Sequence, residues 1–159
     1  MNEATQVLKN FRWDGSLPIP VFDIASDYAL VLGEDLTSEG LSGQCFASHP
    51  RNNGGPLIIY NIESATSHQK FTVAHELGHI VLNHGDALRD PTKNFNRYNF
   101  DPKEVQANQF AAELLMPISA INYYLGEVGE YSLERLSRIF GVSQMAINIR
   151  LKNLGFING

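Results

Sequence analysis

The stretch Phe71-Thr-Val-Ala-His75-Glu76-Leu-Gly-His79-Ile-Val-Leu82 decides how the rest of the chain is interpreted. Its two histidines are four residues apart, so in a helix both imidazoles lie on one face and can bind a single metal ion. Zinc suits such a pair, because it takes neutral imidazole and keeps a position for water when three protein groups bind it. Glu76 follows the first histidine and stands beside that open position, where a general base for the water is needed.

The flanks of this motif are apolar on nearly every side, which predicts a buried helix. A buried helix whose histidines bond each other or a backbone carbonyl is the alternative interpretation. However, two imidazoles and a carboxylate in an apolar setting need a partner, and a metal ion supplies one. We therefore predict a zinc site here, although the same ligand types also accept manganese or iron.

The segment Asp101–Pro117 supplies the third ligand in this interpretation. With Asp101 as N-cap, a helix turning about 100° per residue places Glu104 and Asn108 on one face with small residues, and Glu113 on the opposite face. We predict that Glu104 binds the metal and that Asn108 orients one of the two ligating histidines through its second nitrogen. Asp101 and Glu104 also fit a capping box, so helix capping is the competing role for Glu104.

His84 does not complete the metal site in this interpretation. Metzincins place their third histidine six residues after the second, and that position here is Gly85. We expect His84 at or just beyond the C-terminus of the helix, where a cation interacts well with the exposed carbonyls. Tyr60 and Tyr98 are two candidates for the group that stabilises the oxyanion.

Residues 70–84 and 104–117 together resemble the two central motifs of the ImmA/IrrE family of metallopeptidases, and residues 140–155 resemble its usual ending. The resemblance spans about residues 18 to 157. It implies an α+β, zincin-like fold in which a short antiparallel sheet packs on the HExxH helix and a helix-turn-helix-like pair ends the chain. It also implies zinc at the positions matching His75, His79 and Glu104, with Glu76 as base.

The resemblance further implies what the protein acts on. The characteristic substrate in this family is a helix-turn-helix repressor of a mobile element or stress operon, so we expect a zinc-dependent endopeptidase that cleaves one such partner protein. The alternative is a regulator that binds DNA, or that sequesters a repressor without cutting it, with a metal site that is structural or sensory.

Composition and charge restrict the cell compartment and the kinds of partner that we expect. The chain has 159 residues, a net charge of −5 and a pI of about 5.5, which argues against general nucleic-acid affinity. A single cysteine, Cys45, excludes an internal disulfide and fits a reducing cytosol. We find no signal peptide and no apolar run of the roughly 20 residues that span a bilayer. We therefore expect a cytoplasmic protein that does not contact a membrane.

The remaining patterns outline the other elements. Apolar residues at helical spacing predict a scaffold helix from Val21 to Leu32, after a short N-terminal helix within residues 3–13. Two strand-like runs follow, Leu41–Ser48 and Leu57–Asn61, joined by a loose hairpin turn rich in Gly and Asn. In zincins a sheet edge lies beside the active-site helix, and the sequence leaves open which of the two strands forms it.

We assign residues 1–128 to the metallopeptidase core and residues 129–159 to a helical segment packed on it. Serines that can cap helices predict one helix over residues 133–140 and a second from Ser143 to about residue 153, which is a helix-turn-helix shape. This segment has a local surplus of positive charge. We predict that Arg135 and Arg138 bind the protein partner, with DNA as the less favoured target.

Overall fold

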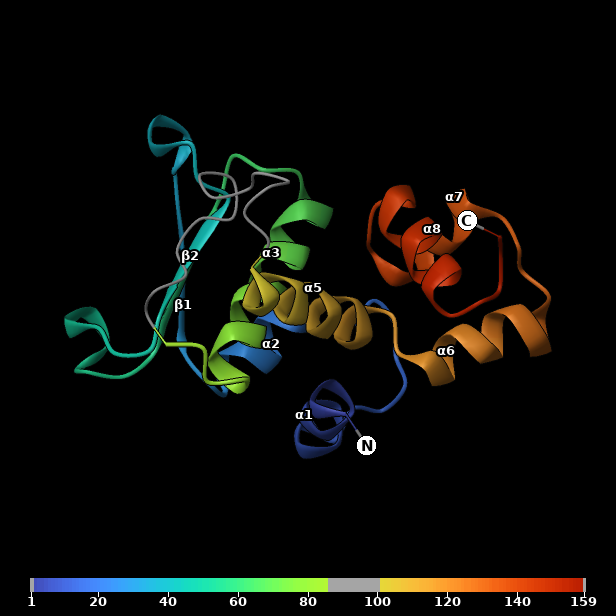
Figure 1. The fold of residues 1–159 in the computed structure, drawn as a ribbon, viewed down its shortest axis with the longest axis horizontal. Helices are drawn as coiled ribbons and strands as arrows, with labels where there is room; N and C mark the ends of the chain where they lie inside the picture. The colour runs from blue at the N-terminus through green and yellow to red at the C-terminus, as the bar shows by residue number, and fades with distance from the viewer. Residues whose placement is uncertain (1, 86–100, 159) are drawn as a thin grey trace.

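The computed structural model describes residues 2–85 and 101–158, which form an α+β fold (Figure 1). The helices are α1 (Glu3–Phe11), α2 (Val21–Ser26), α3 (Thr66–Val81), α5 (Pro102–Leu115), α6 (Ile118–Asn122), α7 (Leu133–Phe140) and α8 (Gln144–Asn153). The strands are β1 (Leu30–Glu34), β2 (Gly43–Phe46) and β3 (Leu57–Asn61). None of the helices within the described ranges is long and apolar enough to cross a membrane.

The three described strands form one small sheet in the order β1-β3-β2. β2 runs antiparallel to the central strand β3, with Gly43 opposite Tyr60, as the predicted hairpin requires. β1 runs parallel to β3 on its other side, with Leu30 opposite Leu57. α3 packs against both β2 and β3, and β2 is therefore the outer strand that lies along the HExxH helix.

The predicted scaffold helix from Val21 to Leu32 is wrong in its second half. The helix α2 ends at Ser26, and the chain becomes the strand β1 at Leu30. Residues 30–32 are apolar and pair with β3, so hydrogen bonds to a distant strand override the local helical spacing. The sheet consequently has a parallel edge that the hairpin pattern alone does not predict.

α3 and α5 make the most extensive contact between any two elements of the described chain. Gly78 permits this contact, because a Cβ atom at that position would lie 3.0 Å from Phe110 Cδ1 and 3.3 Å from the backbone oxygen of Ala107. A glycine on one helix thus faces an alanine on the other, and the two backbones come close. This approach brings the first turn of α5 to the face of α3 that carries the histidines (Figure 1).

α1 docks on the main core, where Ala4, Val7 and Leu8 are buried and the helix contacts α5. At the other end of the chain, α7 and α8 follow the predicted pattern. The Ser132 and Ser143 side chains accept hydrogen bonds from the backbone N–H groups of Arg135 and Ala146. The division of the chain at residue 128 stays a prediction.

Candidate metal centre

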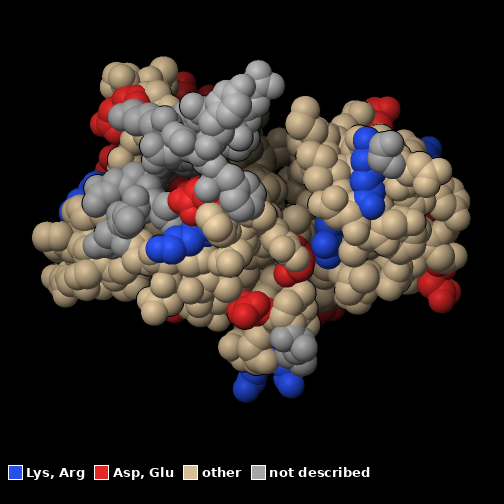
Figure 2. Space-filling view, in the orientation of Figure 1, with Lys and Arg blue, Asp and Glu red and all other residues tan. Residues whose placement is uncertain are grey.

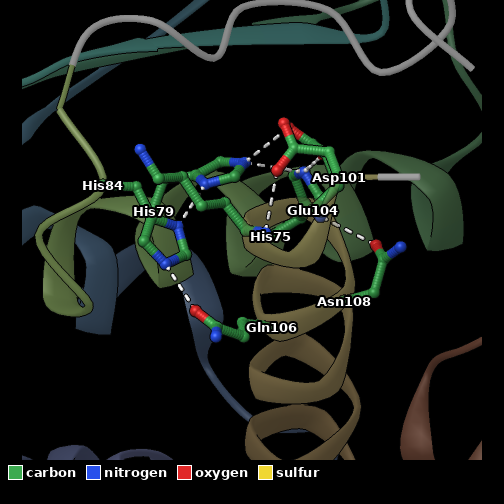
Figure 3. Close-up of polar contacts among 8 residues, drawn as sticks. His75, His79, His84, Asp101, Glu104, Gln106 and Asn108 are labelled. Carbon is green, nitrogen blue, oxygen red and sulfur yellow. Dashed lines mark hydrogen bonds and ion pairs between the residues drawn. The ribbon is translucent and has the colours of Figure 1, made fainter. Parts of the chain in front are cut away.

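His75, His79 and Glu104 come together between α3 and α5 (Figure 3). The two imidazoles project from successive turns of α3 and are 5% and 2% exposed. Glu104 reaches them from the first turn of α5, with Oε2 2.9 Å from His75 Nε2 and Oε1 3.2 Å from His79 Nε2. The two Nε2 atoms are 3.1 Å apart. The three side chains predicted as ligands therefore converge on one point.

This arrangement fits a tetrahedral metal ion. Ligands that bind zinc at about 2.0–2.1 Å are about 3.3 Å from one another in a tetrahedron. The two Nε2 atoms are 3.1 Å apart, and each has one Glu104 oxygen at 2.9 or 3.2 Å, which is close to that spacing. Two imidazole nitrogens and a carboxylate oxygen are also the donor types that zinc takes in catalytic sites. Three protein donors leave a fourth position, which suits a catalytic site more than a closed structural one.

His75 Nδ1 lies 2.8 Å from Asn108 Oδ1. Because an amide oxygen only accepts, the proton of this hydrogen bond lies on His75 Nδ1, which donates, and Nε2 is the ring nitrogen that faces the ligand cluster. Asn108 therefore lies where an orienting residue for His75 is expected. Its side chain is largely exposed, however, and does not face the interior with the small residues of α5 as the helical wheel suggests.

His84 and Gln106 also contact the site, and sequence reasoning missed this. His84 Nδ1 lies 2.8 Å from His79 Nδ1, and His84 Nε2 lies 2.9 Å from Gln106 Oε1 (Figure 3). His84 does follow the end of α3, as expected, and is not one of the three converging ligands. The available signal was the presence of a third histidine five residues after His79.

Glu76 is buried, at 2% exposure, and is not a member of the converging group. It follows His75 on α3, and Gly43 of β2 lies over it. A Cβ atom at Gly43 would lie 3.6 Å from Glu76 Oε1 and would collide with the Thr72 methyl group. The outer strand thus approaches the helix so closely at Thr72 that only glycine fits without a shift, and a Cβ atom there would also lie in van der Waals range of Glu76.

The pKa values of the three converging groups reflect their coupling. Burial would raise the pKa of Glu104, but the contacts of its carboxylate with His75 and His79 outweigh burial and hold the pKa at about 2. Burial lowers the pKa of His79, and the neighbouring His75 adds to that effect. Burial also opposes protonation of His75, yet Glu104 and Glu76 raise its pKa above the ordinary value. Glu104 is accordingly a carboxylate ion near neutral pH.

Capping and metal binding are separate tasks on α5. Asp101 Oδ1 accepts a hydrogen bond of 2.9 Å from the Lys103 backbone N–H, so Asp101 caps the helix by itself. The Glu104 carboxylate points at the histidines instead. Glu113, expected on the solvent face, is half-buried and accepts a hydrogen bond of 3.2 Å from Gln109 Nε2.

Of the two candidate oxyanion groups, the structure describes only Tyr60. The Tyr60 ring packs edge-on against Phe22 of α2, with ring centroids 5.1 Å apart. Tyr98 lies outside the described residues. Arg135 and Arg138 lie on α7, exposed at their side chains, and contact Glu130 at 3.5 Å and Glu134 at 3.1 Å.

An α+β fold with an HExxH helix against a small sheet is that of a zincin-like metallopeptidase domain. A family model described as the IrrE N-terminal-like domain, Peptidase_M78, matches residues 29–152. The chain therefore belongs to the ImmA/IrrE family of metallopeptidases, as the two motifs predicted.

Two curated relatives are similar over part of their length. Metallopeptidase ImmA of Bacillus subtilis (strain 168) is 30% identical over 97 residues, which are 61% of this chain and 57% of that protein. Uncharacterized immunity region protein 2 of Bacillus phage phi105 is 33% identical over 85 residues, 54% of this chain and 52% of that protein. The chain thus spans about half the length of the curated relatives it matches.

A solved structure has a similar fold. A Mycobacterium tuberculosis transcriptional regulator aligns with a TM-score of 0.63 and 15% identity, over 94% of this chain and 46% of that one. At this identity the match supports the architecture alone.

Proposed function

We propose that this protein is a zinc-dependent endopeptidase in which His75, His79 and Glu104 hold the metal and Glu76 is the general base. The convergence of two Nε2 atoms and a carboxylate within about 3 Å of one another carries the proposal. Membership of a metallopeptidase family supports it independently.

The chemistry divides between the metal and the chain. When bound, zinc acts as a Lewis acid that makes water nucleophilic near neutral pH. Glu76 accepts a proton from that water while the water oxygen forms a bond to the scissile carbonyl carbon. When the carbon–nitrogen bond breaks, Glu76 returns the proton to the leaving nitrogen. Such proton transfer typically contributes about 10²–10⁴-fold to the rate.

The relatives support a regulatory protein as the substrate. One is named a metallopeptidase, and another is named for the immunity region of a phage. Together with the family resemblance, these names favour a helix-turn-helix repressor of a mobile element or stress operon as the protein that is cleaved.

A groove of about 850 Å³ beside the metal centre supports a polypeptide substrate. Its walls continue the helix faces that carry the ligands, since Phe71 lies one turn before His75 on α3 and Asn108 lies one turn after Glu104 on α5. A chain with its scissile bond at the metal therefore extends naturally into this groove. We place the adjoining segment of the repressor there.

The opposite wall of the groove comes from α8, which faces α3 and α5 across it (Figure 1). Three large apolar residues of the lining are exposed: Val105 at 45%, Met145 at 72% and Ile149 at 50%. Exposed apolar side chains gathered in one groove mark a protein-binding surface. They suit an apolar segment of the repressor better than a nucleic acid.

Three arginines of the helix-turn-helix-like pair have partners within the protein, which weighs against a DNA-binding surface there. Arg150 is buried, at 8% exposure, and its Nε donates a hydrogen bond of 3.1 Å to the Met116 carbonyl. Arg135 and Arg138 contact glutamates. Lys and Arg cover only small parts of the face of the molecule that Figure 2 shows and form no broad continuous patch on it. These observations favour the peptidase over the DNA-binding alternative.

Glu76→Gln tests the proposal directly. A base contacts the attacking water and not the metal, so the variant is expected to keep zinc and fold while cleavage falls at least about 10²-fold. Zinc per chain, the thermal midpoint and cleavage of candidate helix-turn-helix repressors from neighbouring reading frames are measured together with the wild type.

Two outcomes would contradict the proposal in different ways. Full cleavage by a zinc-loaded Glu76→Gln variant removes Glu76 from the role of base. A wild-type protein that binds the repressor tightly but never cuts it favours the sequestering alternative.

A further inference from the structure

His84 is brought back over His79 by the way α3 ends. Asn83 has a left-handed backbone, with φ of 59°, and its N–H donates to the Ile80 carbonyl at 3.1 Å. The next N–H, that of His84, donates to the His79 carbonyl at 2.9 Å. These two bonds form a Schellman motif, in which an apolar contact often joins the residues that occupy the positions of His79 and His84. Here that contact is a hydrogen bond between two imidazoles.

Two hydrogen bonds link His79 to His84 and His84 to Gln106. Only one assignment of donors and acceptors along this series leaves His79 Nε2 able to bind a metal. Gln106 Oε1 only accepts, so His84 carries its proton on Nε2 and presents a lone pair on Nδ1. His79 must then donate from Nδ1, which leaves a lone pair on its Nε2. The reverse direction would place a proton on His79 Nε2, the atom that faces His75 and Glu104.

We propose that His84 and Gln106 are positioning residues that hold His79 in the tautomer that binds the metal. This inference rests on the proposed metal site, and it gives His84 a role beyond closing the helix. His75 needs no such chain, because Asn108 accepts directly from its Nδ1. The two histidines are therefore oriented differently: His75 by Asn108 directly, and His79 by Gln106 through His84.

Gln106 offers a clean test, because it is exposed and its replacement leaves the core intact. Full-length wild type, Gln106→Ala, Gln106→Glu and His84→Ala are compared. Zinc affinity is measured by competition with a chromophoric chelator, and the proton position on His79 is measured in metal-free protein by two-bond ¹H–¹⁵N NMR. Gln109→Ala is the control, since Gln109 is exposed on the same helix and bonds Glu113 instead.

Gln106→Ala and His84→Ala are expected to weaken zinc binding about tenfold or more, as loss of such supporting hydrogen bonds usually does. In both variants the His79 signal should shift from the Nδ1–H tautomer towards the Nε2–H tautomer. Gln106→Glu keeps an acceptor and should bind zinc as tightly as wild type or tighter. Gln109→Ala should match wild type in both measurements.

Wild-type zinc affinity in both Gln106→Ala and His84→Ala would overturn the inference, as would an unchanged His79 tautomer. A lower thermal midpoint of His84→Ala with unchanged zinc affinity would reduce His84 to a helix-ending residue, which also overturns it. If the zinc effects appear but the wild type cuts no repressor, this inference stands and the proposed peptidase function fails.

Discussion

At the scale of single residues, Glu104 and Glu113 show how position on one helix separates two carboxylates. Glu104 lies against both histidines, and these contacts hold its pKa at about 2 despite burial. Glu113 lies nine residues further along α5 and bonds the amide of Gln109. The first carboxylate is therefore available to a metal as an ion, whereas the second has a local partner outside the converging cluster.

We predict opposite effects of the same substitution at these two positions. Glu104→Gln removes one of three ligands. Loss of a residue that only supports a ligand typically lowers metal affinity about 10–100-fold, and we expect Glu104→Gln to lower zinc affinity more than that. Glu113→Gln should change it less than about twofold, as expected for a substitution away from the site. Elemental analysis after dialysis and chelator competition measure both, and equal metal loss would contradict the assignment of Glu104.

At the scale of elements, the close crossing of α3 and α5 sets the distance between the ligands. Gly78 stands between the two histidine-bearing turns, and its missing side chain leaves room for Phe110 and the backbone at Ala107. The HELGH stretch therefore does two things at once: it supplies ligands on one face, and it allows the helix with the third ligand to approach.

Gly78→Val should push the two helices apart. The added side chain overlaps Phe110 and Ala107, so the expected loss is about 1–3 kcal/mol of unfolding free energy, with weaker zinc binding. Gly126→Val is the matched control, because a Cβ atom there meets nothing within 4 Å. Thermal midpoints and zinc affinities measure the effect, and wild-type zinc affinity in Gly78→Val would show that the crossing does not control the site.

The α7–α8 pair could contact the repressor with two surfaces: the wall of the groove on α8 and the exposed arginines of α7. Substitutions on each surface test its contribution separately. Ile149→Glu places a negative charge in the groove. The double variant Arg135→Glu, Arg138→Glu reverses the charge on the exposed face of α7. We predict that both weaken cleavage of the folded repressor and spare cleavage of a short peptide spanning the scissile bond. Loss of one buried contact or one charge pair is worth about 1–3 kcal/mol, or roughly 5–150-fold.

Ile118→Glu is the control for the groove, since Ile118 is equally exposed, at 51%, and lies outside the lining. Comparable loss in Ile118→Glu would show that any surface charge disturbs the protein. Unchanged cleavage by Ile149→Glu would remove the groove from substrate binding.

At the scale of the whole molecule, the proposed metal site joins α3, which follows the sheet, to α5, which leads towards the C-terminal segment. Ligands from both α3 and α5 mean that a bound ion cross-links two parts of the core that are distant in sequence. Removing zinc with EDTA should therefore lower the thermal midpoint.

The size of this effect follows from mass action. Zinc at 100 times its dissociation constant stabilises the folded protein by about 2.7 kcal/mol, which is about 5–10 °C for a chain of this size. Added zinc should restore the midpoint of wild type. The Glu104→Gln variant should show little change at the same zinc concentration, and a full zinc-dependent shift in that variant would place the metal elsewhere.

The sequence by itself determined the parts of the site that depend on spacing within one helix. Residues four apart share a helical face wherever the helix lies, so the pairing of His75 with His79 follows from the motif alone. The same relation placed Glu104 and Asn108 together on a second helix, and capping chemistry located where that helix begins. Family membership also followed from these two local motifs.

Only the tertiary structure decided the contacts that depend on how elements lie against one another. Residues 30–34 became a strand because β3 was there to pair with them, against their helical spacing. His84 and Gln106, 22 residues apart, meet because α3 ends in a left-handed turn and α5 crosses close by. Arg150 contributes to the positive surplus of the C-terminal segment in the sequence, but packing buries it and its Nε donates to the Met116 carbonyl. Spacing within one helix determines on which side of that helix a residue lies. These contacts depend in addition on how two elements are placed relative to each other.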